Sequence, residues 1–522
     1  MKLKVTFGQW SHRRLPSVFA AVCWLVIGAT AAPATAASAD GTHILYAWGN
    51  NSFGEVGDGT TEPRAVPVPV AGSTSDFSEV AASGAGAVAL RADGTVWTWG
   101  LSTLLGDGST ANRATPGKVP TLPPIKHISA SILGPHVLAV GTDGSLWAWG
   151  TNGSGELGDG TKTYRPTPVK VAISGTITQV AAGNRSSLAL TSTGEVWAWG
   201  DNEFGQLGNA DNTGPSGSVT PVRVIVPDGI IQIQSGNYFG VALRSDGSVW
   251  TWGDNREGEL GDGSTADKRT VGTRVLNATG ITKITAHFLH VMALAEDGTV
   301  WAWGWNLWGQ IGDGGPNGVR RSPVHLGLQG ITRIDTGTVA SVAIDAGGHL
   351  RYWGRNLGGE SGTGRTDLTL DQPTLVNRLT GVVRADFGGI AVYATADPGG
   401  VAWPITGYAD KCVDVSGANP TDGTKVQTWT CNGTNAQQWT ITGSTIQALG
   451  KCLDVNGANP ASGTKVQLWT CNGTAAQQWT INGDGTIRAL GKCLDVTGTN
   501  SNDGTPLIIW DCHGGPNQHW NI

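Results

Sequence analysis

A segment of about 50 residues recurs along most of this chain, and it limits the possible folds more than any other feature. Each copy contains a short apolar run that ends in Trp-Gly, as in TVWTWG, SLWAWG and EVWAWG. The glycines of these pairs are Gly49, Gly100, Gly150, Gly200, Gly253, Gly304 and Gly354. One copy is too small to bury its own apolar face, so neighbouring copies must pack against one another.

A second apolar run, of the type VAxG…LAL, lies upstream of most Trp-Gly runs. In several copies Asp-Gly separates the two runs, and a tight β-hairpin needs turn residues that accept positive φ. Hairpins repeated at this spacing predict an all-β chain with a seven-bladed β-propeller over residues 40–395. The 79 glycines and the charged fraction of only 14% agree with many tight turns.

The two ends of the repeat region are incomplete in complementary ways. The first Trp-Gly run, residues 44–48, has no partner run before it, and the last partner run, near Tyr393, has no clear Trp-Gly run after it. We therefore expect these two strands to pair in one composite blade, which would close the ring and remove an open sheet edge. Residues 400–403 are the alternative strand for that position.

These repeats resemble the regulator-of-chromosome-condensation family. The resemblance rests on WGDNEFGQLGNA, WGTNGSGELGDG and WGWNLWGQIGDG, and it covers about 350 residues. It implies the propeller fold but no particular activity, because a mildly acidic chain with an export signal departs from the nuclear, chromatin-binding namesake. Secreted relatives of the fold bind other proteins, so the resemblance allows a protein partner on the propeller face.

The tryptophans that recur at one place in every blade are best explained by packing between blades. The sixth repeat departs from this pattern, because Trp305 and Trp308 occupy loop positions that are filled by other residue types elsewhere. His287 replaces a usual glycine and Phe288 follows it. These four residues are candidates for a protein interface, and local packing in one unusual blade is the alternative. His287 and His290 have no evident third ligand, so no metal site is predicted.

The N-terminus has the pattern of an export signal. Four basic residues precede an apolar run over residues 18–32, and Ala34-Thr35-Ala36 fits a small-x-small cleavage site. We expect a signal peptide over residues 1–36 and a secreted, extracellular protein without membrane attachment after cleavage; an uncleaved anchor is the alternative. The net charge of −6 provides no basic excess for phosphates, so nucleic acid is not an expected partner.

Six of the seven cysteines lie in the last 111 residues, within a second type of repeat. Its three copies begin KCVDV, KCLDV and KCLDV, and the two cysteines of each copy are 19 residues apart. Six cysteines permit 15 pairings, but repeat symmetry favours one bridge in each copy, and an exported chain meets an oxidising compartment. The expected disulfides are Cys412–Cys431, Cys452–Cys471 and Cys493–Cys512.

Each of these copies also carries a Gln-x-Trp signature, QQW in two copies and QHW in the third. Together these features resemble the ricin B-chain lectin family, most closely carbohydrate-binding module family 13 of secreted bacterial proteins. The resemblance implies a β-trefoil over residues 405–522, after a linker at 396–404, that binds a glycan or polysaccharide at up to three weak sites. Its six Lys and Arg against eight Asp give a net −2, which favours neutral glycans.

In that family an aspartate accepts hydrogen bonds from sugar hydroxyls, an aromatic side chain faces the sugar ring, and nearby polar residues complete the site. The first copy supplies Asp414, Gln427, Trp429, Asn432 and Gln437. The second copy supplies Asp454, Gln467, Trp469, Asn472 and Gln477. The third copy supplies Asp495, Trp510, His513, Asn517 and Gln518.

The three copies depart from the family pattern in different places. Ala436 and Ala476 stand where the family often has asparagine, and Ile508 replaces the strand glutamine of the other two copies. One or two sites are therefore expected to be weak or silent. For the aspartates, turn capping is the alternative role.

No catalytic motif is found, because HExxH, GxSxG and a phosphate-binding loop are all absent from the sequence. The repeated Gly-Asp-Gly segments recur at equivalent places, as turns do. We therefore expect a non-enzymatic protein without a cofactor, in which the propeller is a protein-interaction scaffold. A glycoside hydrolase with two carboxylates on the propeller face is the main alternative, and a secreted protein inhibitor or adhesin is another.

Overall fold

The computed structural model describes residues 43–520 apart from 74–76, 212–216, 364–368, 377–378, 380, 390, 397–401, 433, 443 and 483–484. The predicted signal peptide, residues 1–36, lies outside this range. Within it the chain is all-β, as predicted, and no helix there is long and apolar enough to cross a bilayer. The short 3₁₀ turns are η1 (Ser102–Leu104), η2 (Tyr408–Asp410), η3 (Ser416–Ala418), η4 (Asn435–Gln437), η5 (Asn456–Ala458), η6 (Ala475–Gln477), η7 (Thr497–Thr499) and η8 (Pro516–Gln518).

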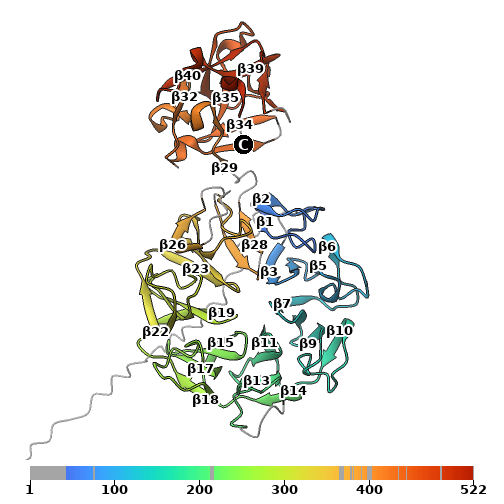
Figure 1. The fold of residues 1–522 in the computed structure, drawn as a ribbon. Helices are drawn as coiled ribbons and strands as arrows, with labels where there is room; N and C mark the ends of the chain where they lie inside the picture. Colours follow the sequence, from blue (N-terminus) through green and yellow to red (C-terminus); the bar gives the residue numbers. More distant parts are fainter. Residues whose placement is uncertain are drawn as a thin grey trace, which may run out of the picture. The chain divides into compact units, whose positions relative to one another are not determined.

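Seven antiparallel sheets of four strands each form the predicted propeller, and Figure 1 shows them around a ring. Six of the seven blades each consist of four strands that are consecutive in the sequence, and these six blades follow in chain order. The first three of these are β3 (Phe77–Ser83), β4 (Gly86–Arg91), β5 (Val96–Gly100), β6 (Arg113–Lys118); β7 (Ile125–Ala130), β8 (His136–Gly141), β9 (Leu146–Gly150), β10 (Arg165–Val171); and β11 (Ile177–Ala182), β12 (Ser186–Thr191), β13 (Val196–Gly200), β14 (Ser218–Arg223). The next three are β15 (Ile230–Ser235), β16 (Phe239–Arg244), β17 (Val249–Asp254), β18 (Lys268–Arg274); β19 (Ile281–His287), β20 (His290–Ala295), β21 (Val300–Trp305), β22 (Val319–Leu326); and β23 (Ile331–Thr336), β24 (Ala340–Asp345), β25 (Leu350–Arg355), β26 (Thr369–Leu375).

The seventh sheet joins the two ends of the repeat region. Its strand order is β2 (Arg64–Pro69), β1 (Ile44–Gly49), β28 (Ala391–Ala396) and β27 (Arg384–Phe387). β1 runs antiparallel to β28 with an unbroken register from Ile44 opposite Ala396 to Gly49 opposite Ala391. The predicted closure by residues 44–48 is therefore confirmed. The alternative strand, β29 (Ala402–Trp403), pairs with β33 (Trp439–Thr442) of the C-terminal repeats.

The tryptophan of each Trp-Gly pair holds its blade to the preceding one. Trp99 is fully buried, and its indole N–H donates to the carbonyl of Glu55 at 2.7 Å. The same bond to a neighbouring blade is made by Trp48, Trp149, Trp199, Trp252, Trp303 and Trp353. Gly57 lies against this ring at φ +75°, where an added Cβ would be 2.7 Å from the Trp99 indole nitrogen. Packing between blades thus explains these tryptophans.

The Gly-Asp-Gly segments are loop turns. Asp58 accepts hydrogen bonds from the Thr60 backbone N–H at 2.9 Å and from its hydroxyl at 2.7 Å. The same carboxylate forms an ion pair with Arg64, at 2.5 Å. Equivalent ion pairs are Asp107–Arg113, Asp159–Arg165, Asp262–Arg269 and Asp313–Arg320. These carboxylates therefore stabilise their own loops.

The C-terminal repeats fold into the predicted β-trefoil. Besides β29 and β33, its strands are β30 (Thr406–Gly407), β31 (Lys411–Val415), β32 (Thr424–Thr430), β34 (Thr445–Ala448), β35 (Lys451–Val455), β36 (Thr464–Trp469), β37 (Thr480–Ile481), β38 (Ile487–Ala489), β39 (Lys492–Val496) and β40 (Thr505–Trp510). The equivalent strands β32, β36 and β40 pair with one another and so join the three copies. Trp439, Trp479 and Trp520 of the Gln-x-Trp signatures lie in the shared core.

Candidate functional site

Each trefoil copy places an aspartate and a tryptophan on two paired strands. In the first copy β31 pairs with β32, so that Cys412 lies opposite Trp429 and Asp414 lies opposite Gln427. Trp429 and Gln427 are two residues apart on one strand and therefore face the same side of the sheet. The pairs β35–β36 and β39–β40 repeat this register in the second and third copies.

The aspartates and the tryptophans differ sharply in exposure. Trp429, Trp469 and Trp510 are 39%, 37% and 42% exposed. Asp414, Asp454 and Asp495 are only 6%, 5% and 3% exposed. Each copy therefore combines an aromatic side chain open to solvent with a carboxylate that is almost buried.

In the first two copies, two glutamines fix the aspartate. Gln427 Nε2 donates to Asp414 Oδ1 at 3.0 Å, and Gln437 Nε2 donates to Asp414 Oδ2 at 3.2 Å. Asp454 accepts equivalent bonds from Gln467 and Gln477 at 3.0 and 3.1 Å. Each carboxylate oxygen retains further acceptor capacity, because a carboxylate offers about four lone-pair positions.

The third copy holds its aspartate differently. Asp495 Oδ2 accepts hydrogen bonds from Asn517 at 2.9 Å and from Gln518 at 2.8 Å, and His513 Nε2 lies 3.4 Å from the same oxygen. Ile508, opposite Asp495, has no amide to donate. Among the described residues no donor contacts Asp495 Oδ1. In the first two sites, by contrast, each oxygen of the aspartate accepts a hydrogen bond from a glutamine.

The glutamines of the Gln-x-Trp signatures link the aspartate to the loop after the second cysteine. Gln437, Gln477 and Gln518 are fully buried. Their Oε1 atoms accept hydrogen bonds from the backbone N–H groups of Asn432, Asn472 and His513, at 2.8, 2.8 and 2.9 Å. Their Nε2 atoms also donate to the carbonyls of Thr430, Thr470 and Asp511. All their polar atoms thus have partners within the protein.

The disulfides have the predicted pairing. They join Cys412 to Cys431, Cys452 to Cys471 and Cys493 to Cys512. Each bond ties the strand that carries the aspartate to the loop that follows the tryptophan strand. The disulfides therefore restrain the two walls of each site, and they stabilise the fold mainly by restricting the unfolded chain.

A contact that joins neighbouring copies of the trefoil repeat was not predicted from the sequence. Asp503, in a loop of the third copy, accepts hydrogen bonds from the Thr430 N–H at 2.7 Å and from Lys411 Nζ at 2.8 Å. Asp422 makes the same bonds to the second copy. The hydrogen bond from Lys411 is the largest factor that lowers the pKa of Asp503. The sequence does contain a pattern that could have predicted this contact, because a lysine begins every copy and the loop aspartate recurs in two of them.

The candidate interface residues, which belong to the blade of β19–β22, are only partly brought together. The rings of Phe288 and Trp305 are in edge contact, with centroids 5.8 Å apart. Trp308 is half-buried, and the Arg355 guanidinium lies 6.0 Å from its ring. His287 Nδ1 lies 2.5 Å from the carbonyl of Thr336. In the described part of the chain, no three His, Cys, Asp or Glu side chains gather as metal ligands.

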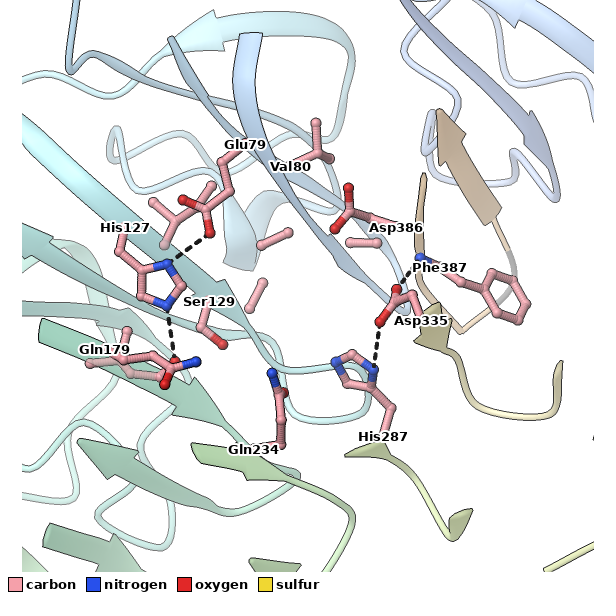
Figure 2. A pocket seen from close by; sticks show the side chains of 15 residues that line it. Glu79, Val80, His127, Ser129, Gln179, Gln234, His287, Asp335, Asp386 and Phe387 are labelled. Carbon is pink, nitrogen blue, oxygen red and sulfur yellow. Dashed lines mark hydrogen bonds and ion pairs between the residues drawn. The ribbon is translucent and has the colours of Figure 1, made fainter. Parts of the chain in front are cut away.

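A polar cavity of about 130 Å³ lies between the inner strands of the propeller, as Figure 2 shows. Its polar lining is Glu79, His127, Ser129, Gln179, Gln234, His287, Asp335 and Asp386. Burial opposes a charge on His127, but Glu79 at 2.8 Å outweighs it, so the pKa of His127 is raised. Sequence reasoning named only His287 of this set, because the other residues vary in type between blades.

Family comparisons agree with both halves of this description. Residues 402–520 match the ricin-type β-trefoil lectin domain. Residues 170–404 match the RCC1-like domain, and residues 43–90 and 143–190 match the regulator of chromosome condensation (RCC1) repeat.

Individual relatives cover the propeller. The human E3 ubiquitin-protein ligase HERC2 is 30% identical over 304 residues, which are 56% of this chain but only 6% of that protein. The Arabidopsis thaliana ultraviolet-B receptor UVR8 is 30% identical over 294 residues, 54% of this chain and 66% of the receptor. Yeast RCC1 (Prp20), solved bound to Kap60, is 21% identical with a TM-score of 0.61 over 69% of this chain and 89% of that one, a likeness of fold. The chain therefore carries RCC1-like repeats followed by a ricin-type β-trefoil lectin domain.

Proposed function

We propose that this is an exported, non-enzymatic protein that holds neutral glycans through the trefoil and a protein partner through the propeller. The observation that carries the proposal is the threefold recurrence of an exposed tryptophan beside a nearly buried, oriented aspartate. Ricin-type lectin domains bind carbohydrate, and RCC1-like relatives bind proteins, which supports the two roles.

The chemistry of a sugar fits this combination. A hexose has directional hydroxyl donors and an apolar face of C–H groups. A carboxylate with spare lone pairs forms charge-assisted hydrogen bonds with adjacent hydroxyls, and the exposed ring of Trp429 offers a flat apolar surface to the C–H face. Because Asp414 is already fixed by Gln427 and Gln437, little conformational entropy is lost when it binds.

The predicted site residues divide into two roles. Gln437, Gln477 and Gln518 are buried and fully hydrogen-bonded, so we assign them to positioning the aspartates. The aspartates, the exposed tryptophans, Asn432 and Asn472 are the groups that would touch the sugar. We also assign a different sugar geometry to the third site, because Asp495 Oδ1 is open there and His513 stands in place of asparagine.

Binding of a polymer is expected to exceed binding of a monosaccharide. A shallow site with one aromatic contact and one or two charge-assisted bonds gives a dissociation constant near ~1 mM, or about −4 kcal/mol. When two or three sites hold one chain, the second binding event becomes intramolecular and the apparent affinity rises steeply. The net −2 of the trefoil gives acidic glycans no advantage.

The test is a glycan array on the secreted full chain, followed by titration with the best polysaccharide. Replacing Asp414, Asp454 and Asp495 together with asparagine should abolish binding, because each substitution removes roughly 1.5–3 kcal/mol at its site. Asp410→Asn is the matched control, since Asp410 is exposed and asparagine tolerates its positive φ of 56°. A folded triple variant that binds polymer as the parent does would refute the lectin role of these loops.

The same polysaccharides also test the alternative that the propeller is a glycoside hydrolase. The five Gly-Asp-Gly aspartates that pair with arginines are engaged in loop ion pairs, which disfavours them as catalytic acids. The same polysaccharides should therefore show no new reducing ends after prolonged incubation with the protein. Release of reducing sugar that the triple variant retains would instead place catalysis on the propeller.

A further inference from the structure

Each of the seven blades contributes one inner strand, and the pairing of that strand with its neighbour shows which residues occupy equivalent positions in all blades. Two such sets of equivalent positions are called the first and the second level. The first level is Glu79, His127, Gln179, Gln232, Lys283, Arg333 and Arg384. The second level, two residues later, is Ala81, Ser129, Ala181, Gln234, Thr285, Asp335 and Asp386. The cations stand in the first level, and two carboxylates stand in the second, nearer to the loops that follow the inner strands.

The polar cavity is lined by residues of both levels: Glu79, His127 and Gln179 from the first, and Ser129, Gln234, Asp335 and Asp386 from the second. It is lined by the carboxylates Glu79, Asp335 and Asp386 and by two histidines, and among the described residues no lysine or arginine lines it. A volume of about 130 Å³ exceeds the ~30 Å³ share of one water molecule about fourfold. The cavity therefore has room for a small functional group.

Two of its three carboxylates have partners inside the protein. Glu79 pairs with His127 Nδ1 at 2.8 Å. Asp335 accepts hydrogen bonds from the Thr285 hydroxyl and from the Phe387 N–H, each at 2.8 Å. These groups form the walls of the cavity and do not require a ligand.

Asp386 and Gln234 are different. In the described part of the chain no donor contacts the Asp386 carboxylate, and no polar atom contacts the Gln234 amide; Figure 2 shows both at the open space. Burial is the main factor that raises the pKa of Asp386 well above its ordinary value; Asp335 and Glu79 add to the rise, and Arg384 and Arg333 oppose it. An unpaired acceptor among other carboxylates favours a donor-rich, positively charged group.

An apolar cavity of about 330 Å³ lies beside the loops on the same side of the propeller. Its lining is largely apolar, with Leu101, Ile132, Leu133, Pro135 and Val339, and it also includes the charged residue Arg355. A third, smaller cavity shares Ile132 and Leu133 with it and shares His287 with the polar cavity. The lining residues of the three cavities therefore overlap in series, and the largely apolar cavity beside the loops is named the entrance.

We propose that the centre of the propeller is a second ligand site, which takes one alkylammonium or guanidinium group carried on an apolar body. The charged nitrogen pairs with Asp386, the Gln234 amide oxygen accepts a further N–H, and the apolar body occupies the entrance. This proposal rests on the scaffold role proposed for the propeller and gives that scaffold a chemical preference. The trefoil takes no part in it.

The test titrates the full-length protein with Nα-acetyl-arginine methylamide and, separately, with the uncharged isostere Nα-acetyl-citrulline methylamide. Saturable binding of the arginine probe, at least tenfold tighter than the citrulline probe, is expected because only the guanidinium is charged. Equal affinity for the two probes, or no saturable binding of either, would overturn the proposal without recourse to any variant.

Variants then locate the site. Asp386→Asn should weaken the arginine probe at least tenfold, while Asp371→Asn, an exposed carboxylate on the outer strand β26, should leave it unchanged. Both variants should bind polysaccharide as the parent does, so a failed glycan role and a failed cation site give distinguishable results. Wild-type affinity in a folded Asp386→Asn variant would place the probe elsewhere and refute the assignment.

A peptide with arginine between two leucines distinguishes the two sources of such a group. If a protein partner supplies the side chain, the peptide should bind at least tenfold tighter than the single residue, because its leucines fill the apolar entrance. Equal affinity of peptide and single residue would support the site but assign it to a free small cation.

Discussion

Replacement of Glu259 by glutamine should stabilise the propeller, and the gain should grow with pH. Glu259 is fully buried, its Oε2 accepts the Glu257 N–H at 2.9 Å, and its Oε1 has no hydrogen-bond partner among the residues that the structure describes. Burial, followed by the negative charge of Asp254, raises its pKa from 4.5 to about 8. The chain already places glutamine at this position in two other blades, as Gln206 and Gln310.

The magnitude follows from the two pKa values. A carboxyl whose pKa is higher in the folded state stabilises the fold fully below the unfolded pKa, and this stability is lost as pH rises through the folded pKa. The penalty accumulates at about 1.4 kcal/mol per pH unit between these values, which gives roughly 1 kcal/mol at pH 5 and about 4 kcal/mol at pH 8. Glutamine cannot ionise, so Glu259→Gln should recover most of this difference.

Calorimetry of both proteins at pH 5 and pH 8 measures the effect as a difference in the melting temperature of the propeller. The difference should be small at pH 5 and several degrees in favour of the variant at pH 8. Glu156→Gln is the matched control: its blade has Thr151 and Ser154 where Asp254 and Glu257 stand, so its gain should be smaller. A Glu259→Gln gain that does not change with pH would refute the reasoning.

Three further outcomes are expected. Deletion of residues 40–50 should lower the melting temperature of the propeller but leave glycan binding by the trefoil intact; an unchanged propeller transition would contradict closure by β1. Gly57→Ala should cost about 2–3 kcal/mol, because a Cβ there collides with Trp99 and φ is positive, whereas Gly72→Ala, where no described residue lies within 4 Å of an added Cβ, should cost about 1 kcal/mol or less. Alkylation of the unreduced mature protein should label none of the six trefoil cysteines, and labelling of two or more would contradict the disulfide pairing.

The fold could be predicted from the sequence because the same physical demand recurs in every copy. Each blade needs a buried indole that donates to its neighbour and a glycine that leaves room for it, so Trp99 and Gly57 reappear at a fixed period. Closure of the ring followed from two strands that lacked partners. Repetition also fixed the disulfides, because one spacing served all three copies.

The polar cavity could not be predicted, because its residues share neither type nor sequence neighbourhood. Asp386, Gln234 and Glu79 come from three different blades. In a fourth blade Ala181 stands at the position of Asp386 and Gln234, and Gln179 at the position of Glu79. Only the closed ring brings them together. Similarly, resemblance placed Gln437 among the sugar ligands, whereas its burial, which depends on how the trefoil packs, favours the positioning role that we assign to it.

The composite blade also sets an order of events during synthesis. β1 leaves the ribosome about 350 residues before β28, its partner. Joining ends so far apart costs about 5 kcal/mol of chain entropy, so this seam is expected to form last, after the other blades have stacked. Until then two strand edges stay open to wrong partners. A bulky tag attached just before residue 43 would lie at this seam, whereas one attached after the trefoil would not delay closure of the ring.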